Sequence, residues 1–348
     1  MDNVKKFVND YADYALEFIT ALSNPSKRIF LVYLLVSLLF VYVIYKHRKI
    51  AETTGDSFLS FVFPKSVWSN PSAWLDVRYF FFHGLIGHFL IFGIGAALYV
   101  MGLNAGQGVI SALGMEASPT YGPKMGAVIT SVILLIVVIL SDFMAFYLHY
   151  LQHKIPLLWQ FHKVHHSGEV MHSLSNFREH PVDNLTYKAI SNLVVGGVAG
   201  MMFGAIGFAP STPYLIGVFV INACFNLAGY HLRHSHIWLK WPGVWSKIYG
   251  SPAHHHVHHS RHPDHLDKNF AFMLPIWDVL FKTYHMPEDN RDVEFGIVED
   301  ASELNSCVNL YLIPFRDAYR VLTKASKTGT AKGAELDASS ALKVSKGQ

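Results

Sequence analysis

The sequence is poor in charged residues and in cysteine. Asp, Glu, Lys and Arg make up 15% of the 348 residues, compared with about 25% in typical soluble domains. Together with a mean hydropathy of +0.25, this composition excludes an ordinary soluble protein and favours one that lies in a lipid bilayer. The 2 cysteines, Cys224 and Cys307, are too few for a disulfide framework or a thiolate metal site, so a bound metal needs other ligands.

Several other signals are absent. The formal net charge of +3 is small, and we expect the excess of base to contact anionic lipid headgroups and not nucleic acid. The sequence has no Gly-rich dinucleotide fingerprint, no cysteine set for an iron–sulfur centre and no fused cytochrome-like module. If the protein carries out redox chemistry, its electrons must therefore come from a separate protein.

Five apolar runs predict membrane helices, because about 20 apolar residues are enough to cross a bilayer. They are Phe30 to Tyr45, Tyr79 to Met101, Met125 to Tyr147, Ala189 to Pro210 and Tyr214 to Tyr230. The last two runs flank a tight turn that begins at Pro210 and ends at Pro213, and they are expected to form a helical hairpin.

The loops between the runs differ in charge. Basic residues follow the first and third runs, whereas Gly102 to Pro123 contains no Lys or Arg and is expected to be a long connection. By the positive-inside rule, this connection lies outside and the histidine-rich segments lie in the cytoplasm. The absence of an obvious organelle signal favours a bacterial inner membrane over the endoplasmic reticulum.

Histidine is abundant and concentrated. Seventeen of the 21 histidines lie between His149 and His265, and the pattern His-x-x-His-His occurs twice. On a helix, positions i, i+3 and i+4 share one face, so each triplet is expected to direct three imidazoles to a common point. The candidate metal ligands are His149, His153, His162, His165, His166, His231, His234, His255, His258 and His259, with His236 as the alternative to His234.

Such crowding is costly without a ligand, because packed imidazoles repel on protonation and every buried nitrogen needs a partner. A single structural zinc needs four ligands, so this many candidates predict two metal ions. Imidazole suits iron, zinc, copper or nickel. Oxidation of an unactivated C–H bond by O2 requires a metal that changes oxidation state, so we expect two Fe2+ ions with O2 as co-substrate.

Longer motifs surround these histidines. They are HYLQH over residues 149–153, FHKVHHS over 161–167, GYHLRHSH over 229–236, SPAHHHVHHS over 251–260, NF at 269–270 and WDVLFKT over 277–283. In these motifs the chain resembles the fatty acid hydroxylase and sterol desaturase superfamily of membrane non-haem di-iron oxygenases. Two departures, Ala271 and Lys282, stand where the family pattern has glycine, and both leave the candidate ligands in place.

The resemblance covers roughly Ile129 to Tyr284 and implies an all-α polytopic membrane enzyme with a cytoplasmic, histidine-rich helical cap that holds two irons. It implies hydroxylation of an aliphatic C–H bond of a lipid, such as a fatty acyl chain or a sterol, with external electrons. A lipid or sterol desaturase with the same site is the alternative. A metal-binding transporter and a bis-His haem bundle fit less well, because the histidines lie at helix ends and in adjacent positions.

Two polar residues near the motifs are candidates for catalytic support. Asp142 lies in the third apolar run, where a carboxylate is costly and usually functional, and is expected to orient a ligand imidazole. His180 is expected to donate a hydrogen bond behind a ligand or to contact the substrate.

We divide the chain into five expected regions. They are an amphipathic N-terminal segment (1–28), an N-terminal transmembrane region (29–124), a catalytic domain (125–290), a C-terminal helical extension (291–322) and a disordered tail (323–348). The first region is predicted either to lie on the membrane surface or to be a solvated helix. The composition of the tail, which has few large apolar residues, predicts its disorder.

Overall fold

The computed structural model describes residues 2–87, 89, 91, 94–115, 123–207, 212–288 and 293–324. Within these residues the chain is helical, and its only β-type pairing is an isolated antiparallel bridge between Ser260 and Phe295. The predicted all-α membrane class is therefore confirmed, with apolar helices long enough to cross a bilayer and clusters of histidine. The predicted tail lies outside the described residues, except for the end of a helix over residues 307–324.

Three helices are long and apolar enough to cross a membrane. They are α8 (Ile94–Ala112), α9 (Pro123–Lys154) and α11 (Pro181–Ile206). Two shorter apolar helices are α2 (Leu31–His47) and α12 (Thr212–Leu227). Because α9 has 32 residues and about 20 are enough to cross the hydrocarbon, its C-terminal turns project beyond the apolar layer.

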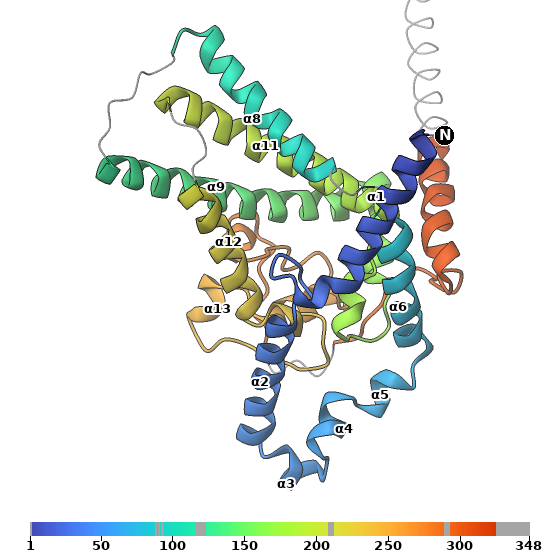
Figure 1. The fold of residues 1–348 in the computed structure, drawn as a ribbon. Helices are drawn as coiled ribbons and strands as arrows, with labels where there is room; N and C mark the ends of the chain where they lie inside the picture. Colours follow the sequence, from blue (N-terminus) through green and yellow to red (C-terminus); the bar gives the residue numbers. More distant parts are fainter. Residues whose placement is uncertain are drawn as a thin grey trace, which may run out of the picture.

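Glycines allow α8 and α11 to lie in close contact. A Cβ atom on Gly102 or Gly106 of α8 would overlap the backbone of α11, and one on Gly200 would overlap the backbone of α8. Small residues at this spacing let membrane helices approach closely. Figure 1 shows the two helices side by side, with α9 next to α11. The expectation of a connection from Gly102 onward is wrong, because α8 continues to Ala112.

The second apolar run also differs from its prediction. It is not one helix, because α6 (Pro71–Phe82) ends within it, a π-helical turn follows at His83–Gly87, and α8 begins at Ile94. The first part of the run packs inside the protein: Tyr79 of α6 is fully buried. Two glycines and a histidine in the turn interrupt the apolar pattern at this point.

The N-terminal helix, the C-terminal helix over residues 307–324 and several short helices form the rest of the described molecule. The N-terminal helix α1 (Asp2–Ile19) is followed by a 3-10 turn at Thr20–Ser23 and packs against the end of α6, where the Tyr14 hydroxyl donates to the Gly84 carbonyl. The remaining elements are α3 (Ile50–Thr54), α4 (Phe58–Val62), α5 (Lys65–Trp68), α10 (Pro156–His166), α13 (Trp245–Ile248), α14 (Pro252–His258) and α15 (Ile276–Phe281), with 3-10 turns at Ser173–Phe177, Tyr230–Leu232 and Pro263–His265.

Two apolar cores hold the site between them. Side chains of α9 and α11, including Ile133, Val137 and Phe203, form one core between the membrane helices. Leu75 and Tyr79 of α6, Val164 of α10 and apolar residues of the C-terminal segment form the other. Because α10 follows α9 after a single residue, both cores fix the position of the histidine-rich end of α9.

Candidate metal centre

Nine of the ten predicted ligands lie in two adjacent groups. The first group contains His149, His153, His162, His166 and His258, and the second contains His165, His234, His255 and His259. Within each group, one ring nitrogen of every member lies within 4.8 Å of those of the other members. These residues come from α9, α10, α14 and the segment after Tyr230, which lie far apart in the sequence.

The structure divides each triplet between the two groups. His162 and His166 of α10 belong to the first group and His165 to the second, whereas His255 and His259 belong to the second and His258 to the first. Residues four apart on a helix differ by about 40° around its axis, but the residue at i+3 points about 100° away from the one at i+4. The expected convergence of all three rings on one point is therefore wrong, and each helix contributes to both groups.

The Nδ1 atoms of five rings are held by hydrogen-bond acceptors. His149, His165 and His258 donate through Nδ1 to the backbone carbonyls of Phe270, Arg178 and Lys268, respectively. His162 donates to the Asp183 carboxylate and His234 to the Ser175 hydroxyl. The five distances are 2.9 to 3.3 Å. Carbonyl and carboxylate oxygens cannot donate, and the Ser175 hydroxyl donates to the His172 carbonyl at 2.8 Å, so these Nδ1 atoms carry the hydrogen. The lone pair of each such imidazole is consequently on Nε2, the arrangement found in metal-bound histidine.

The Nε2 atoms face one another inside each group. Nε2 of His153 lies 3.1 Å from Nε2 of His166, and Nε2 of His255 lies 2.8 Å from that of His234 and 3.0 Å from that of His259. Two nitrogens bound to one metal at about 2.1 Å lie roughly 3 Å apart. Among the described residues, the buried Nε2 atoms of His162 and His258 have no hydrogen-bond partner. The donor set therefore fits two metal ions.

The histidines of α10 are buried in an environment that keeps them neutral. Burial lowers the pKa of His162 to about 3, and burial, together with the proximity of His162, lowers that of His165 to about 4. A cation binds the neutral imidazole and not the imidazolium. Near neutral pH these rings are consequently ready to bind metal without first losing a proton.

His231 and His236 lie outside both groups. The Nε2 atom of His236 donates to the Phe61 carbonyl at 2.7 Å, whereas His234 lies in the second group. His231 is buried in the 3-10 turn at Tyr230–Leu232 and is the predicted ligand that the structure does not bring to the others. The 3-10 turn ends at Leu232, so His231 and His234 do not lie on one continuous helix.

Asp142 and His180 contact neither group. The Asp142 carboxylate accepts hydrogen bonds from the backbone N–H groups of Met273 and Leu274 and from the indole of Trp277. It thus anchors the segment that follows Phe270, whose carbonyl holds His149. Both nitrogens of His180 are occupied: Nδ1 accepts from Val182 N–H and caps α11, and Nε2 donates to the Tyr311 carbonyl.

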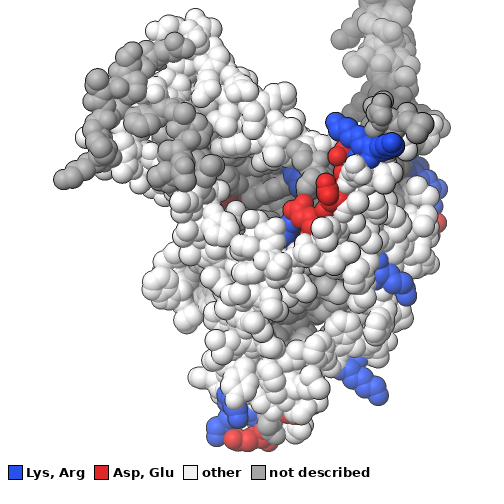
Figure 2. All heavy atoms as spheres, in the orientation of Figure 1, with Lys and Arg blue, Asp and Glu red and all other residues white. Residues whose placement is uncertain are grey.

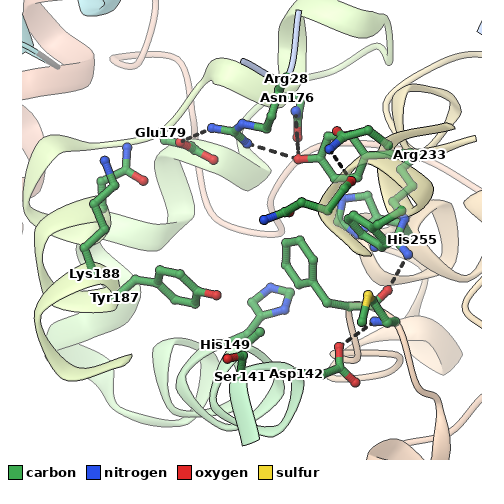
Figure 3. Close-up of a pocket in the computed structure, with 18 of the residues that line it drawn as sticks. Arg28, Ser141, Asp142, His149, Asn176, Glu179, Tyr187, Lys188, Arg233 and His255 are labelled. Atoms are coloured by element: carbon green, nitrogen blue, oxygen red, sulfur yellow. Dashed lines mark hydrogen bonds and ion pairs between the residues drawn. The ribbon is translucent and has the colours of Figure 1, made fainter. Parts of the chain in front are cut away.

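A cavity of about 430 Å³ opens onto both groups. His149 and His162 of the first group and His165 and His255 of the second line it. Its other walls carry apolar residues of α9 and α12, such as Val137 and Ile221, and polar residues near the start of α11. Figure 2 shows a hollow on this face with basic and acidic side chains at its edge, and Figure 3 shows Tyr187 and Lys188 on one wall, Glu179 and Arg28 on another and His149 on a third.

Sequence reasoning missed several residues that shape this site. Asp183 holds His162 and accepts a hydrogen bond from Gln152, and Arg178 pairs with the fully buried Asp76. The backbone of Arg178 holds His165, so the ion pair fixes a histidine indirectly. A carboxylate two residues after Pro181, at the start of an apolar run, was the available signal for Asp183. For Asp76 and Arg178, 102 positions apart, the sequence holds no such signal.

The fold and the histidine groups define a helical membrane protein with a candidate dinuclear metal centre. Residues 134–283 match the fatty acid hydroxylase family model. The chain therefore carries a domain of the fatty acid hydroxylase superfamily, and the resemblance predicted from the motifs is confirmed.

Three similar proteins illustrate the relationship. An alkylglycerol monooxygenase of Danio rerio is 31% identical over 152 residues, which cover 44% of this chain and 30% of that protein. The ornithine lipid hydroxylase OlsE of Rhizobium tropici is 26% identical over 159 residues, 46% of this chain and 44% of that protein. A cholesterol 25-hydroxylase-like protein of Danio rerio is 30% identical over 149 residues, 42% and 53% of the respective chains. The chain thus spans less than a third to about half of these relatives. No solved structure matches.

Proposed function

We propose that this protein is a membrane di-iron oxygenase that hydroxylates an aliphatic C–H bond of a lipid. The observation that carries the proposal is the cavity between the membrane helices, which is lined by histidines of both metal-binding groups. The names of the relatives, which refer to an alkylglycerol, an ornithine lipid and cholesterol, support a lipid as the substrate. The ligands are the nine grouped histidines.

Two bound iron ions would supply O2 activation, with electrons from a separate donor protein. The chain itself supplies position and exclusion of water. Val137, Val138, Val218 and Ile221 form an apolar wall along which a lipid chain can lie. This wall leads to His149 and His255, so a methylene group held there lies next to both metal-binding groups.

Carboxylates near the histidines offset charge and fix ring orientation. Asp183 accepts from His162 at 2.9 Å, and Asp267 lies 3.6 Å from Nδ1 of His153. Two divalent cations bound by neutral imidazoles alone would leave a large uncompensated charge in a buried site. Both carboxylates would therefore offset the charge of the loaded centre, and Asp183 also holds the ring of His162.

The proposal includes an orientation of the protein in the membrane and a position for its N-terminal helix. The basic residues that follow the first and third apolar runs support a cytoplasmic catalytic side, and the membrane we propose is a bacterial inner membrane. The exposed apolar side chains Val4, Phe7 and Leu16 support a position of α1 on the membrane surface. We assign residues 125–290 to the catalytic domain and residues 291–322 to an extension that covers it.

Metal analysis and isotope labelling test the function. Protein purified from iron-replete cells is expected to hold about two irons per chain, because each group supplies four or five imidazoles. His162→Ala and His255→Ala, one from each group, should lower the iron content, and His47→Ala, on the exposed end of α2, should not. Incubation of lipid extracts with 18O2 and a reductant should give a lipid with one added 18O atom. A metal content that the two substitutions leave unchanged contradicts the proposal, and a product with a new double bond and no 18O identifies a desaturase.

A further inference from the structure

The metal-facing cavity carries three cationic and three acidic side chains, which differ in how far they are already bound within the protein. Arg28, Lys188 and Arg233 line it together with Asp142, Asp183 and Glu179. Asp142 accepts hydrogen bonds from the backbone N–H groups of residues 273 and 274, and Asp183 accepts from His162 and Gln152. Neither carboxylate is therefore available to pair with a cationic side chain at the rim of the cavity.

Arg233 is also occupied within the protein. Its guanidinium donates to the Phe272 and Gly250 carbonyls and lies against the rings of Phe225 and Tyr230. This leaves Arg28 and Lys188 as the cations of the rim, opposite a single carboxylate, Glu179.

Arg28 and Lys188 are incompletely paired. The Arg28 guanidinium lies 3.6 Å from the Glu179 carboxylate, donates to the Tyr230 hydroxyl at 3.0 Å and lies over the Phe177 ring, while 40% of its side chain stays exposed and can pair with a ligand. Lys188 lies two turns into α11, in a segment apolar enough to cross a membrane, and Figure 3 draws no interaction to its ammonium group. Within the part of the chain that the structure describes, Lys188 makes neither an ion pair nor a hydrogen bond. A cation in such a helix is costly unless it has a partner.

A third residue of the cavity, Asn226, has a hydrogen-bond acceptor without a donor in the described part of the chain. Asn226 of α12 is 8% exposed and donates through Nδ2 to the Asn222 carbonyl, which fixes the orientation of its amide. Its Oδ1 atom is buried and accepts no hydrogen bond from any described residue. A buried acceptor of this kind calls for a donor, and a hydroxyl or an amide N–H of a ligand would supply one.

We propose that Arg28, Lys188 and Asn226 form a headgroup site for an anionic amphiphile inside the metal-facing cavity. The ligand carries a phosphate or carboxylate that pairs with Arg28 and Lys188, and a hydroxyl or amide N–H that donates to Asn226 Oδ1. Its alkyl chain lies along the apolar wall of α9 and α12. This inference rests on the proposed hydroxylase function and adds the class of its substrate.

The same geometry determines which carbon is oxidised. The cationic rim, Asn226 and the histidines line one cavity of about 430 Å³, which is near the lower end of the range for ligand pockets. A headgroup bound at the rim therefore leaves room for only the first part of the chain before the histidines. The oxidised carbon lies close to the headgroup, and the rest of the chain extends between the membrane helices.

Binding experiments on the iron-loaded protein in neutral detergent test the site. The probes are 1-O-dodecylglycerol 3-phosphate, neutral 1-O-dodecylglycerol and inorganic phosphate, with Kd measured by microscale thermophoresis in the absence of reductant. The phosphate amphiphile is expected to bind about tenfold more tightly than the neutral lipid, because its phosphate forms charge-assisted hydrogen bonds with Arg28 and Lys188 that the neutral lipid cannot form. Inorganic phosphate should bind much more weakly than either lipid, because it lacks the chain.

Variants separate the two parts of the site. Lys188→Gln should remove most of the preference for the phosphate lipid, and Lys188→Arg should retain it. Asn226→Ala should weaken both lipids about equally, because both carry a hydroxyl. Lys247→Gln, which removes a charge from the exposed helix α13, is the matched control and should bind like wild type. Melting temperature and iron content verify that each variant is folded.

Three results would overturn the headgroup site: equal binding of the two lipids by wild type, an unchanged preference in Lys188→Gln, or inorganic phosphate as tight as the phosphate lipid. The wild-type comparison remains decisive even where a variant does not fold. Selective binding of the phosphate lipid without oxidation of either lipid would support the headgroup site and contradict the hydroxylase function. Oxidation of both lipids with equal Kd would support the hydroxylase function and contradict the headgroup site.

Discussion

Replacement of Asp183 by asparagine tests how the protein holds its metal. Two donors converge on this carboxylate: Gln152 Nε2 reaches Oδ1 at 2.6 Å and His162 Nδ1 reaches Oδ2 at 2.9 Å. Asparagine keeps one carbonyl oxygen and replaces the other with an NH2 group, so either His162 loses its acceptor or the Gln152 amide must turn and accept from the new NH2 group. The negative charge behind the first histidine group is lost in both cases.

The size of the effect follows from the position of Asp183 behind a ligand. Loss of a hydrogen bond to the outer nitrogen of a metal-bound histidine typically costs about 10- to 100-fold in metal affinity. This corresponds to roughly 1.4 to 2.7 kcal/mol of binding free energy. We expect the loss of affinity in Asp183→Asn to lie toward the upper end of this range, because only 10% of the Asp183 side chain is exposed.

Competition with a coloured ferrous chelator measures this affinity directly. Asp264→Asn is the matched control, because Asp264 is 81% exposed and lies on a short turn away from both groups. Asp183→Asn should release its iron at about 10- to 100-fold lower chelator concentration than the control. Equal release by both variants, with normal helical content by circular dichroism, would refute the argument that Asp183 holds His162 for a metal.

Further predictions concern stability, measured as the free energy of unfolding in detergent. Gly106→Ala places a methyl group against the backbone of α11 and should destabilise the protein by about 1 to 3 kcal/mol, whereas Gly108→Ala on the same helix meets no atom within 4 Å and should be neutral or stabilising. Asp76→Asn leaves the buried Arg178 uncompensated and should cost about 3 to 5 kcal/mol; a loss below about 1 kcal/mol, as for an exposed ion pair, would contradict the burial argument. Burial lowers the pKa of His83 to about 4 from 6.5, so its neutral form contributes stability above pH 6.5 that is lost as the pH falls toward 4, and His83→Gln should make the decline shallower; an unchanged slope would show that His83 does not titrate this way.

The sequence predicted which histidines lie together better than it predicted their arrangement. Spacings of three and four on a helix, repeated twice, were enough to select nine histidines that the structure brings together. The same spacings could not show that His165 belongs with His255 and not with His162, because this depends on how α10 and α14 cross. His231 illustrates the same limit, since it lies in a 3-10 turn whose end the spacing does not reveal.

The apolar pattern predicted the membrane helices least well where helices pack on one another. The apolar run ends at Met101, so Gly102 and Gly106 were expected to lie in the connection that follows it. In the structure they lie inside α8, where the lack of a side chain lets the backbone of α11 approach. Their role is set by the partner helix, and a single-sequence pattern of apolar residues contains no information about that partner.

The role of a polar residue in an apolar run depends on neighbours that only the fold brings together. Asp142 was expected behind a histidine and instead binds the backbone at residues 273 and 274, more than a hundred positions away. It still acts near a histidine, since the residues that it anchors closely follow Phe270, whose carbonyl holds His149.

The path from the bilayer to the metal centre links these observations. Helix α9 crosses the apolar layer and carries His149 and His153 on the turns that project from it. The cavity runs along the same helix, with Val137 and Val138 on its membrane side and His149 at its inner end. A lipid chain can therefore reach the histidines without leaving an apolar surface, whereas Arg28 and Lys188 stand at the rim where a charged headgroup must stop. The position of the bound headgroup, and not the length of the chain, would therefore determine which carbon is oxidised.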